Sequence, residues 1–220
     1  MQVNIILTSY NRPVLLKRAV DSFLNQTDTQ WQLWLQDDNS DEETRAVIAS
    51  YTDPRIHVGY HETAPEERTL KTRYAVLINE IVPQIPDGSI VGYLCDNVEY
   101  YPTLVSKVRL FFDKFPDAFM GYVPQMRDVW SEDGRTYRGT AAQFQHWSVL
   151  PPQVKTLVGN VFGQLDHSQV FHRTPAGMDW SEDIATVRNG DGLFYTLLAT
   201  RRGPIYPIVE YPLTLEHLLK

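Results

Sequence analysis

Residues 89–102 read SIVGYLCDNVEYYP, and this stretch decides how the centre of the chain folds. It opens with a run rich in β-forming residues, and the turn-forming sequence Pro-Asp-Gly at 86–88 precedes it. The run stops at Asp96 and Asn97, so we expect a buried strand that ends in polar residues. Ligands of open α/β sheets bind at such strand ends, and the directly preceding residue, Cys95, belongs to the same edge.

Toward the N-terminus, short apolar runs alternate with amphipathic segments. The expected strands are 3–8, 31–36, 55–60 and 89–95, and the expected helices are 12–26, 44–51 and 67–82. Pro13 suits the first turn of the first helix, and Ser40 with Glu43 has the spacing of a capping box for the second. This alternation with short connections predicts an α/β fold with a mostly parallel central sheet and helices on both faces.

The pattern loosens in the second half of the chain. We expect a helix over 102–115, a hairpin turn at 131–134, an irregular aromatic loop over 141–158, a strand over 169–173 and a helix from about Asp191. There is no repeat, linker or low-complexity tract. We therefore expect a single domain over 1–220, with a nucleotide-type half (1–100) and a more irregular half (101–220).

The bulk composition excludes several classes of protein. The chain is 43% hydrophobic and 21% charged, which suits a globular core, and no run approaches the roughly 20 apolar residues of a membrane span. The N-terminal residues enter a strand without a basic segment or cleavage site, and there is one cysteine, so we expect a cytoplasmic protein without disulfides. The net charge of −7 argues against nucleic acid as a partner.

The strand ends carry the candidate chemistry. Residues 8–13 read TSYNRP where a dinucleotide-binding fold has its glycine-rich turn, and there is no P-loop either. Phosphates must then be held in another way, and Asp96 is placed to bind a divalent cation that carries them, although it could instead cap a turn. Residues 37–40 (Asp-Asp-Asn-Ser) could read a pyrimidine edge through a carboxylate, or could form a solvated turn with a helix cap at Ser40.

Two further sets of residues are open to more than one interpretation. Arg68, Lys71 and Arg73 lie on one face or on neighbouring faces of the expected helix 67–82. They could counter a pyrophosphate or pair with nearby glutamates. His167 and His172 suggest a metal pair, but their spacing on a strand points the rings apart, so we do not expect zinc catalysis.

Taken together, several motifs resemble those of the family 2 glycosyltransferases of the GT-A fold. The matching stretches are TSYN (8–11), DDNSDEET (37–44), ERTLKTRYAVLIN (67–79), DN (96–97), DHSQVFHR (166–173) and GD (190–191). They follow one another in the family's order and cover about the first 200 residues. The resemblance implies a GT-A domain with a nucleotide-binding half and an acceptor-side half.

The resemblance also implies roles for individual residues. Those expected at the nucleotide are Thr8, Tyr10, Asn11, Asp38, Arg68 and Cys95. Asp38 would hold the pyrimidine and Arg68 the base or diphosphate, so the implied donor is a UDP- or dTDP-sugar. Asp96 would bind Mn²⁺ or Mg²⁺ at the two phosphates.

The implied reaction is an inverting sugar transfer to a carbohydrate or glycosylated acceptor, in surface or spore polysaccharide synthesis. Asp191 matches the position of the base that deprotonates the acceptor hydroxyl, and Asp183 and Glu182 follow it as candidates. Family members usually have an acidic residue where this chain has Cys95. A non-catalytic module that binds a sugar nucleotide or a glycan is therefore the alternative, and a nucleotidyltransferase is disfavoured because no triphosphate loop is present.

Overall fold

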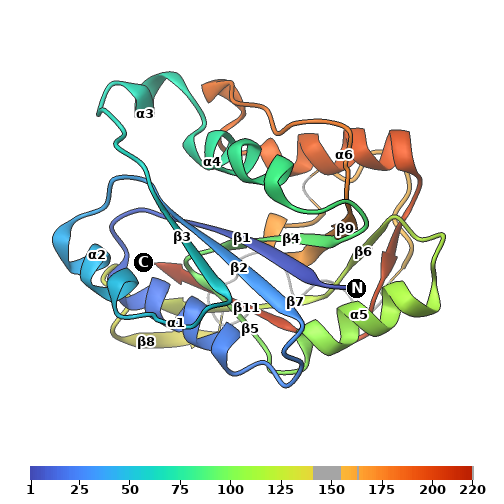
Figure 1. Cartoon of the computed structure of the whole chain (residues 1–220), viewed down its shortest axis with the longest axis horizontal. Helices are drawn as coiled ribbons and strands as arrows, with labels where there is room; N and C mark the ends of the chain where they lie inside the picture. Colours follow the sequence, from blue (N-terminus) through green and yellow to red (C-terminus); the bar gives the residue numbers. More distant parts are fainter. Residues whose placement is uncertain (141–154, 163, 220) are drawn as a thin grey trace.

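The computed structural model of the chain describes residues 1–140, 155–162 and 164–219. A seven-stranded sheet lies between two layers of helices (Figure 1). Its strands, in spatial order, are β10 (Ile205–Pro207), β6 (Met120–Tyr122), β9 (Val170–Arg173), β4 (Ile90–Cys95), β1 (Val3–Ser9), β2 (Trp31–Asp37) and β3 (Ile56–Tyr60). The strands from β4 to β3 are parallel, and β9 runs antiparallel to both of its neighbours. The predicted mostly parallel sheet is therefore confirmed.

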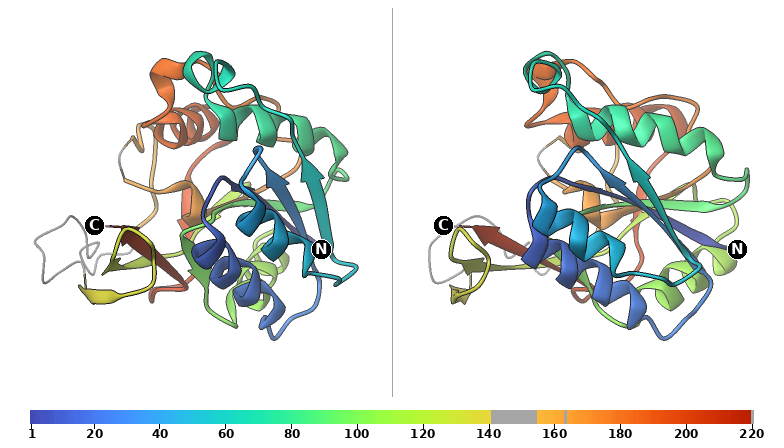
Figure 2. Two further views of the ribbon diagram at one scale, coloured as in Figure 1. Left: turned by 90° about the vertical axis from the view of Figure 1, so that its left-hand side faces the viewer. Right: turned by 60° about the vertical axis from the view of Figure 1, so that its left-hand side comes forward.

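Helices cover both faces of this sheet, as the sequence predicts. They are α1 (Pro13–Leu24), α2 (Glu42–Ala49), α3 (Glu67–Leu70), α4 (Arg73–Ile81), α5 (Leu104–Lys114) and α6 (Gly190–Arg202). Short 3₁₀ helices are η1 (Val82–Gln84), η3 (His167–Gln169) and η4 (Ile184–Thr186). Figures 1 and 2 show α1, α2 and α5 below the sheet and α4 and α6 above it. Each layer thus combines helices from both halves of the chain.

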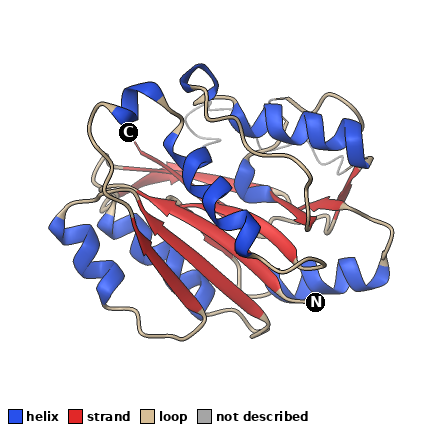
Figure 3. Cartoon of the chain, turned by 45° about the horizontal axis from the view of Figure 1, so that its top comes forward, coloured by secondary structure: helices blue, strands red, loops and turns tan. Residues whose placement is uncertain are grey.

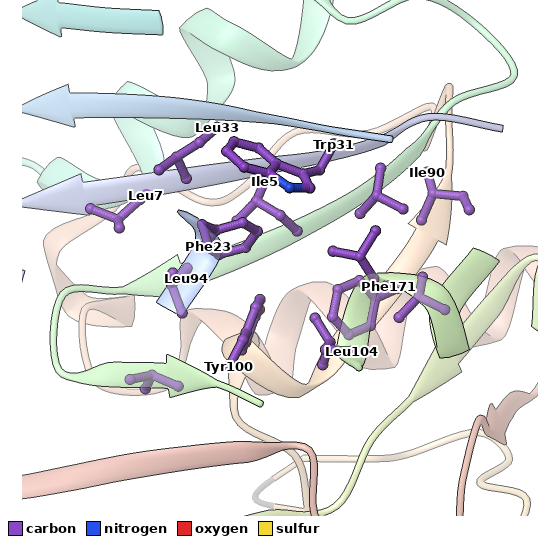
Figure 4. Close-up of a cluster of buried hydrophobic side chains, with 14 of the residues drawn as sticks. Ile5, Leu7, Phe23, Trp31, Leu33, Ile90, Leu94, Tyr100, Leu104 and Phe171 are labelled. Atoms are coloured by element: carbon purple, nitrogen blue, oxygen red, sulfur yellow. The ribbon is translucent and has the colours of Figure 1, made fainter. Parts of the chain in front are cut away.

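The two helical layers bury alternate residues of the central strands. Ile5 and Leu7 of β1 belong to the core between the sheet and helices α1 and α5, whereas Ile6 belongs to the core between the sheet and helices α4 and α6. Figure 4 shows Ile5 and Leu7 packed with Phe23 and Trp31 in the first of these cores. Because successive side chains of a strand point to opposite faces, β1 must be apolar on both. The run 3–8 has this composition and forms the predicted strand.

The predicted helix 67–82 is helical over Glu67–Leu70 and Arg73–Ile81 but is not continuous, because the chain leaves the helix at Lys71 and Thr72. Lys71 has extended backbone angles (φ −132°, ψ 150°) and forms an isolated β-bridge with Asp183. The Thr72 amide donates to the Glu182 carbonyl at 2.8 Å, and the Thr72 hydroxyl donates to the Asp183 carbonyl at 2.7 Å. These distant backbone partners replace the helical hydrogen bonds and divide the segment into α3 and α4.

The cap of α2 also differs from the expectation. The N-cap residue is Asp41, whose Oδ1 accepts a hydrogen bond from the Thr44 amide at 2.8 Å. Ser40 instead accepts the Asn11 amide at 3.1 Å with its hydroxyl. The cap moves by one residue because the Ser40 side chain is used to join two loops of the sheet edge.

A smaller sheet lies beside the main one. Its strands, in spatial order, are β5 (Val98–Tyr100), β11 (Thr214–Leu219), β7 (Gln125–Trp130) and β8 (Tyr137–Thr140). The β7–β8 pair is the predicted hairpin with its turn at 131–134, but the sequence did not indicate β5, β10 or β11. Most of the expected loop 141–158 lies outside the described residues. Among the described helices, none is long and apolar enough to cross a membrane.

Candidate functional site

The carboxyl ends of β1, β2 and β4 meet at one edge of the main sheet. Thr8 of β1 is level with Gln36 of β2 and with Cys95 of β4. Figure 3 shows these parallel strands side by side, and the residues that follow them therefore share one edge. The predicted convergence of Thr8–Asn11, Asp37–Ser40 and Asp96–Asn97 is confirmed.

Asn11 joins the first two loops of this edge. Its Oδ1 accepts the Asp41 amide at 2.7 Å, and its own amide donates to the Ser40 hydroxyl at 3.1 Å. Asn11 and Asn39 both have positive φ angles, of 52° and 60°, which asparagine tolerates better than most residues. The Asn11 side chain therefore shapes the edge through its hydrogen bond with the Asp41 backbone.

Asp38 is the centre of a buried polar cluster beside this edge. Its carboxylate accepts hydrogen bonds from the Thr63 hydroxyl at 2.5 Å, from Arg68 Nη1 at 2.6 Å and from Arg73 Nη2 at 3.1 Å. Arg68 also lies over the ring of Tyr10, with 3.6 Å between Cζ and the ring centroid. Tyr10 is exposed, so it and Arg68 form an open, flat wall against which a planar ring can stack.

The three basic residues of segment 67–79 do not share a helix face. Arg68 of α3 and Arg73 of α4 converge on Asp38 because the break between the helices turns the chain. Lys71 points away from them and pairs with Glu182 at 2.9 Å. The expectation of pairing with nearby glutamates holds only in part, because Glu67 lies 3.5 Å from Arg73 but the other partners are Asp38 and Glu182.

Asp96 is buried at the end of β4 and already has several donors. Arg12 Nη1 lies 3.0 Å from its Oδ1, and the Ser9 hydroxyl lies 3.4 Å from its Oδ2. Burial raises the pKa of Asp96, and the positive charge of Arg12 together with its hydrogen bond opposes this rise. The residue expected to bind a metal thus has an arginine as its counter-ion.

Cys95 faces a different partner from Asp96. Its Sγ lies 2.9 Å from Nε2 of His167, and its amide donates to the Ser168 hydroxyl at 3.4 Å. Burial raises the pKa of the Cys95 thiol well above its usual range, and nearby Asp166 adds to the effect. The thiol is therefore neutral at physiological pH and lies in contact with His167 of the stretch DHSQVFHR.

That histidine belongs to a compact group of possible metal ligands. One ligand atom each from Asp166, His167 and Asp191 lies within 4.8 Å of the other two. Asp166 and His167 are placed by the turn η3, where Asp166 accepts the Ser168 amide at 2.9 Å. Asp191 is in the first turn of α6, and burial raises its pKa, with His167 opposing and Asp166 adding to the rise.

Tyr74 and Gly190 fix the position of this group. The Tyr74 ring is parallel to the His167 ring, with a 6.1 Å centroid distance and a 3° interplanar angle. A Cβ atom at Gly190 would lie 2.3 Å from the Tyr74 hydroxyl oxygen. A side chain at position 190, which directly precedes Asp191, would therefore displace the Tyr74 ring from its place beside His167.

The other two candidate bases are engaged at the break between α3 and α4. Glu182 accepts hydrogen bonds from Lys71 and Asn79, at 2.9 and 3.3 Å, and the hydrogen bond from Lys71 lowers its pKa. Asp183 accepts the Ala185 amide at 2.9 Å and begins the turn η4. Of the three candidates, Asp191 is the one that lies with Asp166 and His167.

His167 and His172 do not meet, as their spacing predicts. His172 is fully buried on β9, where its Nε2 lies 2.8 Å from the Tyr93 hydroxyl and its Nδ1 lies 2.9 Å from the Arg173 carbonyl. Burial lowers the pKa of His172 to about 4, so the ring is neutral. His172 is therefore a core residue.

Sequence reasoning missed Arg12 and gave Asp166 and His167 no role. A usable signal was present for the latter two, because a carboxylate and an imidazole adjoin in the matching stretch DHSQVFHR. Together with Asp191 they offer oxygen and nitrogen ligand atoms. This set of ligands fits a transition-series divalent cation such as Mn²⁺ better than Mg²⁺, which prefers oxygen ligands. Asp96 is not one of the three residues in that group.

Comparisons with known proteins show which sequences and structures this chain is similar to. The model of the family described as "Glycosyl transferase family 2" matches residues 4–64, which contain Tyr10, Asp38 and the aligned ends of β1 and β2. The chain is 32% identical to Protein CgeD of Bacillus subtilis (strain 168) over 223 residues, which is 95% of this chain and 48% of CgeD. The chain thus spans about half the length of that relative.

Solved structures share the architecture. S. aureus TarS 1–349 in complex with UDP-GlcNAc superposes with a TM-score of 0.69 at 15% identity, over all of this chain and 59% of TarS. Glucosyl-3-phosphoglycerate synthase from Mycobacterium tuberculosis, in complex with Mn²⁺, UDP and glucosyl-3-phosphoglycerate, superposes with a TM-score of 0.54 at 13% identity. That match covers 99% of this chain and 70% of the synthase. At these identities the likeness concerns the fold alone.

Proposed function

We propose that the chain is a family 2 glycosyltransferase of the GT-A fold that transfers a sugar from a UDP- or dTDP-sugar to an acceptor hydroxyl with inversion. The acceptor is a carbohydrate or a glycosylated molecule of surface or spore polysaccharide synthesis, and the reaction takes place in the cytoplasm. One observation carries the proposal most directly. One edge of the sheet holds both the Tyr10–Arg68–Asp38 cluster and the Asp166–His167–Asp191 group, because His167 lies against Cys95 at the end of β4.

The first of these sites is suited to the nucleoside. A pyrimidine can stack on the exposed ring of Tyr10, while Asp38 accepts a hydrogen bond from the base N–H. Asp38 is preoriented for this role because Thr63, Arg68 and Arg73 hold it in place. The complex of TarS with UDP-GlcNAc supports a uridine donor, since that protein has the same fold.

The second site is suited to the diphosphate and the chemical step. A divalent cation bound there stabilises the negative charge that develops on the departing nucleoside diphosphate. The residues that would hold it are Asp96 and, across Cys95, His167 with Asp166. Glucosyl-3-phosphoglycerate synthase, which shares the fold, has been solved in complex with Mn²⁺ and UDP, and this supports the use of a divalent cation.

Asp191 is the base in this proposal. Its raised pKa brings the carboxyl closer to neutral pH, where a base accepts a proton from a hydroxyl more effectively. It lies at the start of α6, beside Asp166 and His167, and its Oδ1 accepts the Gly192 amide at 2.7 Å. Asp183 and Glu182 lie outside this group. A carboxylate base in this role contributes about 10²–10⁴-fold to the rate.

A non-catalytic binding module is the second candidate, and Cys95 is the observation that favours it. The neutral thiol stands at a usually acidic position, and a thiol is a poor ligand for a hard cation. Such a module would retain nucleotide binding at Tyr10 and Asp38 and would lack turnover.

Thermal unfolding with UDP, dTDP, GDP or ADP, with and without Mn²⁺ or Mg²⁺, tests the donor site. A nucleotide at 100 times its dissociation constant adds about 2.7 kcal/mol to stability, or about 5–10 °C for a chain of this size. We expect a metal-dependent shift with a pyrimidine diphosphate, and its loss in Asp96→Ala. No shift with any nucleotide would refute the proposed donor site.

Hydrolysis or transfer of UDP-sugars then separates the enzyme from the binding module. We expect Asp191→Asn to lose about 10²-fold or more in rate while it keeps the nucleotide-induced shift. The matched controls are Asp183→Asn and Glu182→Gln, which alter carboxylates outside the Asp166–His167–Asp191 group. Nucleotide binding by the wild type without any turnover would favour the binding module.

A further inference from the structure

We propose that Arg12 couples the binding of the metal to the binding of the donor. Arg12 forms an ion pair with Asp96, and it moves to the donor diphosphate when a divalent cation binds Asp96. The inference rests on the proposed nucleotide-diphosphate donor and adds a positioning residue that the family resemblance did not supply. Its basis is the charge arrangement around the end of β4.

Arg12 differs from the other cations at this edge in its exposure and its partner. The side chains of Arg68 and Arg73, both held by buried Asp38, are 22% and 15% exposed. Arg45, which pairs with buried Asp37, is 36% exposed, and the Arg12 side chain is 46% exposed. Its ion pair is with Asp96, at 3.0 Å. The Arg12 head can therefore leave its partner without unpacking the core.

Asp96 cannot serve Arg12 and a cation in the same way at once. Its Oδ1 accepts Arg12, its Oδ2 accepts the Ser9 hydroxyl, and the side chain is 7% exposed. A cation that bound Asp96 would share a carboxylate whose single negative charge Arg12 already compensates. It would also lie within a few ångströms of the guanidinium, where two positive charges in a partly buried site repel strongly.

A diphosphate removes this conflict. Its oxygens carry enough negative charge for two cations, and a guanidinium binds phosphate oxygens in a bidentate manner. Arg12 is the N-cap residue of α1, directly after the loop 9–11, so its head starts at the edge where the nucleotide would bind. In the complete complex Arg12 would therefore contact the donor diphosphate while the cation binds Asp96.

The coupling has a measurable consequence. Without nucleotide, Arg12 opposes the metal, so the free chain binds Mn²⁺ weakly. Because linkage is reciprocal, the metal strengthens UDP binding by the same factor by which UDP strengthens Mn²⁺ binding. Loss of Arg12 should raise the affinity for Mn²⁺ alone and lower the coupling factor.

The test is a titration of Mn²⁺, by calorimetry or by the electron paramagnetic resonance of free Mn²⁺, with and without UDP. We expect Arg12→Gln to bind Mn²⁺ alone about 5–150-fold more tightly than the wild type, which is the usual range of such couplings. We expect UDP to raise the Mn²⁺ affinity of this variant much less. Arg12→Lys retains the charge and should retain part of the coupling.

Lys17→Gln is the matched control, because Lys17 is on the same helix and pairs with Asp21 instead. A merely structural role of Arg12 would weaken Mn²⁺ and UDP binding together in Arg12→Gln, and this outcome would overturn the inference. An unchanged coupling factor in Arg12→Gln would overturn it as well. Failure of the wild type to bind UDP under any condition would instead refute the proposed function.

Discussion

His217 is the source of a pH dependence of stability that can be worked out from the structure. It is on β11, in the interior of the smaller sheet, and its side chain is 2% exposed. Nδ1 lies 2.7 Å from Asp128 Oδ1 of β7, and Nε2 lies 2.6 Å from Glu99 Oε1 of β5. A neutral imidazole has one N–H, so the proton on the second nitrogen is needed to donate to both carboxylates.

The folded state therefore favours the charged ring. Burial by itself lowers the pKa of His217, but the hydrogen bonds to Asp128 and Glu99 outweigh it and raise the pKa to about 8 from the ordinary 6.5. At about 1.4 kcal/mol per pH unit, this difference corresponds to about 2 kcal/mol of stability. That contribution is complete below pH 6.5 and is lost as the pH rises through about 8.

The assay is urea unfolding at a series of pH values from 6 to 9. We expect the free energy of unfolding to fall by about 2 kcal/mol over this range, or the melting temperature by about 4–8 °C. His217→Gln should be less stable at pH 6 and should lack most of the alkaline decline. A wild type with constant stability from pH 6 to 9, or a His217→Gln variant with an unchanged decline, would refute the reasoning.

Two further predictions concern stability at acid pH and the contact between Gly190 and Tyr74. Because burial lowers the pKa of His172 to about 4, we expect stability to fall by about 3 kcal/mol as the pH drops from 6.5 to 4, and His172→Gln to remove this part of the decline in urea unfolding. Gly190→Ala should reduce sugar transfer at least about tenfold, because the added Cβ meets the Tyr74 hydroxyl 2.3 Å away. Tyr74→Phe in the Gly190→Ala background removes the contacting atom and should restore part of the rate; equal rates in both variants would contradict the steric explanation.

Local sequence patterns were sufficient for much of the fold. The runs 3–8, 31–36 and 55–60 are apolar or alternating over strand length, and each forms a parallel strand within one residue of its expected bounds. The polar residues after them had to share an edge because parallel strands place their carboxyl ends together. The periodicity of the strands is therefore enough to predict that Tyr10 and Asp38 lie at the same edge of the sheet.

Tertiary structure alone decided the features that depend on partners distant in the chain. The break at Lys71–Thr72 exists because residues 182 and 183 supply competing backbone partners more than 100 positions away. The counter-ion of Asp96 is Arg12, and the neighbour of Cys95 is His167.

These pairings depend on how the helices and turns pack on the sheet, and a local sequence pattern does not determine that packing. The sequence by itself thus determined which residues stand at the sheet edge. The long-range tertiary contacts decided which of these edge residues are in contact and which charges are paired.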